Sequence, residues 1–315
     1  MKKSIFVAVC AALCAFTPLC AQSLPAQAQS EQTPRKQQVP VDLMTMVRDA
    51  RCGQVLGNTI VDGVPMRMLL DTGATHTVLH DESVAKLKNP KWLDTRNMQF
   101  KGNSAQRPKL LIASLQVGPG VSPTHPVIVV SLAAIRSMMA EKVDGIVGMD
   151  ILSSLPFTFD FGKNEYYWGT PGTGSLVPLN GTRDMSGRLT LTVKSGEKEF
   201  PLLLDTGSSI TRIFAENWAP GIAGEITAQV GDVDKASRKK MIEGKPGKLE
   251  VAPGVFLKPI SPLICDTTEH AILGTDALAE STLIHIPDPN AYHGKFFLLT
   301  KASAQKTKES DDGKR

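Results

Sequence analysis

Short apolar runs separated by turn residues dominate the middle of the chain. Runs of this kind lie at residues 59–61, 67–70, 127–130, 188–193 and 200–204. Short runs bounded by glycine, proline and asparagine are typical of β-strands. Helical patterning is confined to brief segments such as 131–141, where Ser131 is a candidate N-cap. The pattern therefore predicts an all-β fold.

The N-terminus differs from this β-rich middle. Two lysines at positions 2 and 3 precede the apolar run Ile5–Phe16, which is followed by small residues including Ala21 and Ala28. This order is that of a secretory signal peptide, and the run is too short to span a bilayer. The lysine- and alanine-rich leader is typical of bacteria. We therefore expect cleavage of the leader and a periplasmic or secreted mature protein.

Composition and charge describe an ordinary soluble protein. The chain has 315 residues, 42% of them hydrophobic, and a formal net charge of +4. So small an excess of basic residues gives no indication of a nucleic-acid partner or a membrane-binding surface. Three of the five cysteines lie in the leader, which leaves Cys52 and Cys265 in the mature chain. These two could form a disulfide in an oxidising compartment or could be buried apolar residues.

An internal repeat defines the organisation of the chain. Residues 68–79 (MLLDTGATHTVL) recur as residues 202–213 (LLLDTGSSITRI), 134 positions later, and residues 143–152 (VDGIVGMDIL) recur as residues 270–278 (HAILGTDAL), 126 positions later. Two signatures in the same order at similar displacements predict a duplicated unit. The expected layout is a signal peptide (1–28), a flexible mature N-terminus (29–49), an N-terminal lobe (50–168), a linker (169–178), a C-terminal lobe (179–300) and a polar tail (301–315).

The repeated Asp-Thr-Gly carries candidate chemistry. An apolar strand that ends in this tripeptide presents a carboxylate at the end of a buried element, and glycine lets the backbone turn sharply there. Two copies related by a pseudo-twofold axis would bring Asp71 and Asp205 face to face. Two carboxylates so close cannot both ionise cheaply, so they should share one proton. Such a pair can activate water and polarise a carbonyl, which is general acid–base hydrolysis of an amide.

These segments resemble the active-site pattern of the aspartic proteases of the pepsin and retropepsin clan: three apolar residues, Asp-Thr-Gly, Ala or Ser, then Thr or Ser. The segments 146–148 (IVG) and 272–274 (ILG) are similar to the second signature of that family. The resemblance covers roughly residues 50–300. It implies a bilobal β fold with pseudo-twofold-related lobes, as in pepsin, with lobes closer in size to those of retropepsins.

The resemblance also implies roles for individual residues. Asp71 and Asp205 would be the catalytic dyad, and the supporting residues would be Thr72, Gly73, Ala74, Thr206, Gly207 and Ser208. The threonines would form a reciprocal hydroxyl lattice and the glycines would donate backbone N–H groups. Ala74 departs from the Ser or Thr of pepsin-like lobes. We expect the missing hydroxyl to leave the dyad less acidic and the optimum nearer neutrality. The flap of the first lobe is placed at 99–108, without pepsin's tyrosine.

Other polar residues near the motifs have simpler interpretations. Asp150 and Asp276 also repeat, and the hypothesis for them is N-capping of the following segments. His76 and His80 lie four apart, but a metal site would need a third ligand and a helix, so neither a metal nor a cofactor is predicted. The chain also contains no motif of a zinc peptidase or of a serine hydrolase.

The predicted function is that of an exported, monomeric aspartic endopeptidase. Its substrate would be an extended polypeptide, since main-chain pairing with flaps needs an unfolded segment, and a periplasmic segment of an envelope protein is one candidate. Two alternatives stay open. One is a peptide-binding or scaffolding protein that keeps the fold without turnover. The other is a homodimer that uses one motif from each chain.

Overall fold

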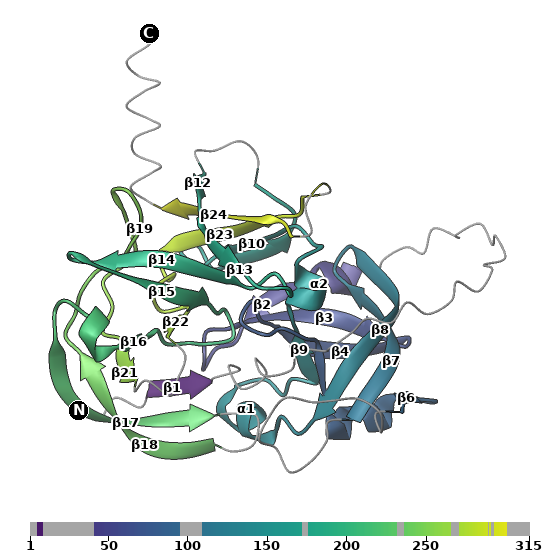
Figure 1. Ribbon diagram of the computed structural model, residues 1–315. Helices are drawn as coiled ribbons and strands as arrows, with labels where there is room; N and C mark the ends of the chain where they lie inside the picture. Colours follow the sequence, from purple (N-terminus) through teal and green to yellow (C-terminus); the bar gives the residue numbers. More distant parts are fainter. Residues whose placement is uncertain are drawn as a thin grey trace, which may run out of the picture.

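The protein is almost entirely β, as the sequence pattern predicts (Figure 1). The computed structural model describes residues 5–8, 41–94, 109–171, 176–231, 236–265, 271–288, 290 and 293–300. Half of the residues lie in strands and a tenth in helices. The predicted flap at 99–108 and most of the predicted leader lie outside the described residues, as does the polar tail.

Elements of the first repeat run from residue 41 to residue 168. The strands are β2 (Met46–Arg48), β3 (Val55–Val61), β4 (Val64–Leu70), β5 (Val78–His80), β6 (Lys91–Leu93), β7 (Lys109–Val117), β8 (Gly120–Val130), β9 (Gly145–Val147), β10 (Phe157–Asp160) and β11 (Glu165–Trp168). The helices are the 3-10 helices η2 (Val41–Met44) and η3 (Asp81–Lys86) and the α-helices α1 (Ala133–Met138) and α2 (Met149–Leu152).

Elements of the second repeat follow in a similar order. The strands are β12 (Val177–Pro178), β13 (Gly181–Arg183), β14 (Leu189–Ser195), β15 (Lys198–Leu204), β16 (Arg212–Phe214), β17 (Ile222–Gly231), β18 (Ala236–Gly244), β19 (Glu250–Ala252), β20 (Val255–Phe256), β21 (Leu263–Cys265), β22 (Ile272–Leu273), β23 (Ser281–Ile286) and β24 (Lys295–Thr300). The 3-10 helix η4 spans Ala215–Asn217. A short strand near the N-terminus, β1 (Ile5–Ala8), pairs in parallel with β17.

The first repeat closes into a six-stranded barrel. Its order is β3-β4-β9-β5-β8-β7, and β7 pairs again with β3 to complete the ring. A two-residue turn joins β3 to β4, with Asp62 and Gly63 at φ of 46° and 81°. Positive φ at both central residues is the geometry of a type I′ turn, which Asp-Gly favours. Strand β4 is buried over its last three residues and leads directly to the first Asp-Thr-Gly.

The second repeat reproduces the pairings that surround this strand. Strand β15 pairs in parallel with β22, as β4 does with β9, and β16 pairs antiparallel with β22, as β5 does with β9. Strand β16 also pairs in parallel with β21, as β5 does with β8. The shared topology confirms the predicted fold class of two related β lobes. Around this core the sheet extends to eleven strands and includes the β17–β18 hairpin beside α1 (Figure 1).

A third sheet joins the ends of the two repeats, in the order β11-β10-β23-β24-β12. Its central pair, β10 and β23, comes one strand from each repeat and runs antiparallel. Three buried phenylalanines pack on it: the rings of Phe157 and Phe159 stack at 4.6 Å, and Phe296 meets Phe157 edge-on at 6.0 Å. Burial of rings of this size adds strongly to stability. This sheet therefore fixes the two repeats against each other.

The helical prediction for 131–141 needs a correction. The helix is shorter, Ala133–Met138, and its N-cap is Leu132 and not Ser131. The main-chain N–H of Leu132 donates to Nδ1 of His80 at 3.0 Å, so that a side chain from β5 fixes the start of the helix. Across the described segments, no helix is long and apolar enough to span a membrane.

Candidate active site

The two Asp-Thr-Gly loops begin at equivalent points of the two repeats. The N–H of Asp71 donates to the carbonyl of Val147 at 3.1 Å, and the N–H of Asp205 donates to the carbonyl of Leu273 at 3.0 Å. Each aspartate thus leaves its strand beside the second signature of its own repeat. Both side chains are fully buried. The parallel pairing of β4 with β9 and of β15 with β22 explains why the two signatures recur together.

Reciprocal threonine contacts join the loops. The hydroxyl of Thr72 donates to the carbonyl of Leu204 at 2.9 Å and accepts the N–H of Thr206 at 3.1 Å. In the mirror arrangement, the hydroxyl of Thr206 donates to the carbonyl of Leu70 at 2.9 Å and accepts the N–H of Thr72 at 3.0 Å. Four buried hydrogen bonds therefore connect the two repeats within one chain. The structure brings together the two motifs that the sequence places 134 residues apart.

The glycines let the loops approach this closely. A Cβ built on Gly73 would lie 2.5 Å from the carboxyl carbon of Asp205, and one built on Gly207 would meet the carboxyl group of Asp71 still more closely. Real Cβ atoms do not make such contacts, so any larger residue would displace the opposite carboxylate. Each glycine thus packs against the aspartate of the other repeat, which places the two carboxyl groups side by side.

The two carboxyl groups have different environments. Oδ1 of Asp71 accepts the N–H groups of Gly73 at 2.7 Å and Ala74 at 3.1 Å. Neither oxygen of Asp205 accepts a well-aligned hydrogen bond from a main-chain donor in the described structure. Burial raises the pKa of Asp205 well above its ordinary value, and the charge of Asp71 and a hydrogen bond with it raise that pKa further. Arg212 and the N–H of Gly207 offset this rise only in part.

This arrangement favours a single proton shared by the pair. Hydrogen bonds to a carboxylate favour its ionised form, whereas burial without them favours the protonated form. The surroundings therefore favour the charge on Asp71 and the proton on Asp205. Because the groups are coupled, their titration belongs to the pair.

Ser208 does not support Asp205 in the manner expected from the sequence. Its hydroxyl donates to the carbonyl of Ile210 at 2.9 Å and not to a carboxylate. A serine at position 74 would, by the same offset, face the carbonyl of His76. The lack of a hydroxyl at Ala74 therefore does not distinguish the two carboxylates. The structure gives no support to the expectation that this missing hydroxyl makes the dyad less acidic.

Asp150 and Asp276 each bind a threonine that follows the Asp-Thr-Gly loop of the same repeat. Asp150 accepts the N–H of Thr77 at 2.7 Å and its hydroxyl at 2.8 Å, and Asp276 accepts the same groups of Thr211 at 2.9 and 2.7 Å. The N-cap hypothesis is wrong for Asp150, because Gly148 is the N-cap of α2 and no side chain caps it. Asp276 does accept the N–H of the next residue at 2.8 Å, but no helix follows it.

Two residues near the dyad, Gln54 and Arg188, were not predicted from the sequence. Gln54 and Arg188 occupy equivalent positions, directly before β3 and β14, the strands that pair with those leading to the Asp-Thr-Gly loops. The amide of Gln54 donates to the carbonyl of Gly207, and Nη1 of Arg188 donates to the carbonyl of Gly73 at 3.3 Å. Each side chain thus reaches the Asp-Thr-Gly loop of the other repeat. The 134-residue offset, extended upstream of the motif, would have identified this pair.

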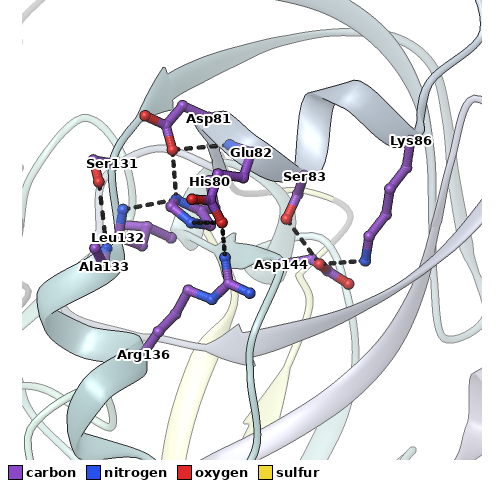
Figure 2. A network of polar contacts seen from close by, with 10 residues as sticks. All are labelled: His80, Asp81, Glu82, Ser83, Lys86, Ser131, Leu132, Ala133, Arg136 and Asp144. Atoms are coloured by element: carbon purple, nitrogen blue, oxygen red, sulfur yellow. Dashed lines mark hydrogen bonds and ion pairs between the residues drawn. The ribbon is translucent and has the colours of Figure 1, made fainter.

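His76 and His80 face different partners and do not converge. His76 bonds to Thr75 at 2.8 Å, and burial lowers its pKa. Figure 2 shows His80 within a polar network that links β5, η3 and α1. There Nδ1 of His80 lies 2.8 Å from a carboxylate oxygen of Asp81, and the ring nitrogen Nε2 lies 3.4 Å from Glu82, which also pairs with Arg136.

Cys52 and Cys265 are both buried, and neither is in a disulfide. The thiol of Cys52 donates to the carbonyl of Met138 at 3.1 Å. Burial raises the pKa of Cys52 to about 12. Of the two interpretations left open by the sequence, the structure supports that of buried apolar residues.

Comparison with known families agrees with this architecture. Residues 58–151 match the family model described as aspartyl protease. The matched segment begins within β3 and includes β4, the first Asp-Thr-Gly loop and the second signature of the same repeat. It confirms the resemblance to retropepsin-like aspartic proteases over the first repeat. No curated protein matches the chain.

Proposed function

We propose that this protein is an aspartic endopeptidase that hydrolyses peptide bonds with Asp71 and Asp205. The observation that carries the proposal is the pair of buried carboxyl groups on two interlocked loops, whose surroundings favour the ionised form of Asp71 and the protonated form of Asp205. The aspartyl protease match over residues 58–151 supports the same reaction class. Dyads of this kind hydrolyse amides without a metal ion or a covalent intermediate.

The reaction follows from the protonation states. The carboxylate of Asp71 takes a proton from a water molecule as its oxygen attacks the peptide carbonyl carbon. Asp205 gives its proton to the carbonyl oxygen, so that a neutral tetrahedral diol forms. The diol collapses when one hydroxyl proton passes to the carboxylate of Asp205 and the proton on Asp71 passes to the amide nitrogen, which breaks the C–N bond and restores the starting protonation states. General acid–base catalysis of this kind contributes a factor of roughly 10²–10⁴ per proton transfer.

The substrate in this proposal is an extended polypeptide segment. Cleavage between two β lobes requires a chain that can pair its backbone with neighbouring strands, and a folded domain does not offer one. Processing of a periplasmic segment of an envelope protein fits an exported enzyme. Export itself is tested by N-terminal sequencing of the protein from the periplasmic fraction. A mature N-terminus near Ala21 or Ala28 supports it, and an intact Met1 contradicts it.

The test of activity uses an unfolded casein-like substrate across pH, with and without a pepstatin-type inhibitor. Asp71→Asn and Asp205→Asn should each abolish cleavage. Asp62→Asn is the matched control, because Asp62 lies in the turn between β3 and β4, where asparagine tolerates the positive φ.

Each alternative has its own outcome. Peptide binding without cleavage at any pH supports the scaffolding alternative. Full activity of one dyad variant would show that the two motifs of a single chain do not form the site. Activity that rises with the square of protein concentration would support the homodimer.

A further inference from the structure

The pseudo-twofold pair Gln54 and Arg188 breaks the symmetry of the dyad. Both side chains cross to the opposite loop and donate to a glycine carbonyl. One donor is a neutral amide and the other a guanidinium, and charged donors form the stronger hydrogen bonds. The two crossings therefore differ in charge at positions where the repeat makes them equivalent.

The same two peptide groups also differ in what their N–H groups bind. In the first loop, the peptide that joins Gly73 to Ala74 accepts from Arg188 through its carbonyl, and its N–H lies 3.1 Å from Oδ1 of Asp71 and 3.4 Å from the main-chain carbonyl oxygen of Asp71. In the second loop, the peptide that joins Gly207 to Ser208 directs its N–H to the main-chain carbonyl of residue 205 at 3.2 Å. The hydrogen-bonded path that starts at Arg188, here called the relay, thus reaches a carboxylate through the Gly73–Ala74 peptide. The equivalent path from Gln54 reaches only a main-chain carbonyl.

We propose that Arg188 is a positioning residue of the dyad, whose guanidinium acts through the Gly73–Ala74 peptide to stabilise the carboxylate of Asp71 and leave the proton on Asp205. Hydrogen bonds in a chain polarise one another, so a charged donor at the carbonyl strengthens the N–H of the same peptide as a donor. The inference rests on the proposed function and adds the residue that sets the roles of the two carboxyl groups.

A turn built by Asp184 holds Arg188 in place. Nε and Nη2 of Arg188 each lie 2.6 Å from Oδ2 of Asp184. Oδ1 of Asp184 accepts the N–H and the hydroxyl of Ser186 and the N–H of Arg188. In the first repeat, the 134-residue offset places Ala50 at this position, and Oδ2 of the neighbouring Asp49 accepts the main-chain N–H groups of Ala140 and Glu141. The clamp on the guanidinium therefore belongs to the second repeat.

Other charged groups surround this relay. The charge of Arg212 lowers the pKa of Asp205, but burial and the charge of Asp71 raise this pKa by more. His76 lies close enough to feel the charges of Arg188, Asp184, Asp150 and His125, and burial lowers its pKa so that its ring is neutral at pH 7. His293 packs beside Gly187 in the same turn, and its pKa is also lowered by burial.

The test is a ¹³C NMR titration of the aspartate carboxyl groups in the full-length protein. Asp71→Asn and Asp205→Asn assign the two resonances. In Arg188→Gln, which installs the neutral side chain of position 54, the lower titration step of the dyad should rise by roughly 0.5–1 pH unit. This pKa shift is smaller than the shift expected from a cation in direct contact with a carboxylate. Asp184 neutralises part of the charge of Arg188, and the effect of Arg188 reaches Asp71 only through a peptide group.

A second variant keeps the positive charge at position 188. Arg188→Lys retains a cation near the carbonyl of Gly73, so the same step should rise less than in Arg188→Gln. A merely structural role predicts that both variants disturb the turn and move the step by similar amounts. Lys194→Gln is the control for loss of one positive charge, because Lys194 pairs only with Glu199 on the surface of β14 among the contacts described. It should leave the titration unchanged.

The outcomes separate this inference from the proposed function. No movement of the lower step in Arg188→Gln, or an equally large movement in Arg188→Lys, overturns the role of Arg188. The titration needs no substrate. A protein that cleaves nothing while its dyad shifts as expected would therefore contradict the peptidase proposal and support the relay. In an active enzyme, the acid limb of the kcat profile should follow the NMR step, and Arg188→Lys should restore part of it.

Discussion

Thr72→Ala removes one half of the hydroxyl lattice that joins the two loops. The variant loses the hydrogen bond to the carbonyl of Leu204 and the acceptor for the N–H of Thr206. Both groups are main-chain groups in a buried interface, where a polar group left without a partner costs about 1–3 kcal/mol. We therefore expect a loss of about 2–4 kcal/mol in the free energy of unfolding. At about 2–4 °C per kcal/mol for a domain of 150–250 residues, the melting temperature should fall by roughly 4–16 °C.

Thr72→Ser is the matched control, because it deletes the methyl group and keeps both hydrogen bonds. Its cost should stay within about 1 kcal/mol, the price of a small cavity. The assay is urea unfolding followed by circular dichroism, with kcat for a peptide substrate measured on the same preparations. The alanine variant should lose activity even under conditions where it is folded, because the lattice orients the loop that carries Asp71.

A double-mutant cycle with Thr206→Ala tests the reciprocity of the lattice. Each hydroxyl accepts from the other threonine's amide, so the two losses should not add, with a coupling of about 0.5–3 kcal/mol. Equal stability of Thr72→Ala and Thr72→Ser would refute the reasoning, since it would show that the hydroxyl has no role in holding the loops. Strict additivity in the cycle would refute the reciprocity alone.

Four further outcomes follow from the site. Asp205→Asn should abolish cleavage and raise the melting temperature at pH 7. Because the pKa of Asp205 is raised in the folded state, the native protein loses stability as the pH climbs above the pKa of this carboxyl in the unfolded chain, and asparagine removes that loss. The difference in melting temperature between the variant and the native protein should therefore vanish near pH 3. Gly73→Ala should inactivate the protein, whereas Gly162→Ala, where a Cβ has ordinary contacts, should not. Cys52 should resist iodoacetamide at pH 8 until urea unfolds the chain. Ala74→Ser should leave the acid limb of the pH–rate profile in place, and a clear downward shift would restore the importance of the missing hydroxyl.

The fold and the centre of the site could be predicted because they depend on local pattern and on repetition. Apolar runs between turn residues indicate strands, and two Asp-Thr-Gly segments 134 residues apart indicate two equivalent loops. The interdigitation of Thr72 with Thr206 follows once the two loops are related by a twofold axis. Nothing in these features depends on which distant side chains surround them.

The misassigned residues have partners that are remote in sequence. Asp150 looks like a helix N-cap because it stands at the start of the short helix α2, yet its carboxylate binds Thr77, 73 residues upstream. The hydroxyl of Ser131 accepts the N–H of Ala133 only at 3.5 Å, and His80 of a different element accepts the N–H of the N-cap residue Leu132 at 3.0 Å. In both cases a tertiary contact supplies the hydrogen bonds that the local pattern assigns to a neighbour in sequence.

The residues that distinguish the two carboxylates lie outside the conserved tripeptides of the repeat. A dyad made by two identical loops would be symmetric, and its proton would have no preferred oxygen until a substrate arrived. Here duplication within one chain lets equivalent positions carry different residues, so that Arg188 stands where the other repeat has Gln54. The N–H of Ala74 reaches the carboxylate of Asp71 as well as its main-chain carbonyl, whereas that of Ser208 reaches the main-chain carbonyl of Asp205. An acid and a base can then be in place before substrate binds, which removes a proton rearrangement from the reaction. Asymmetry of this kind is a physical advantage of carrying both lobes in one polypeptide.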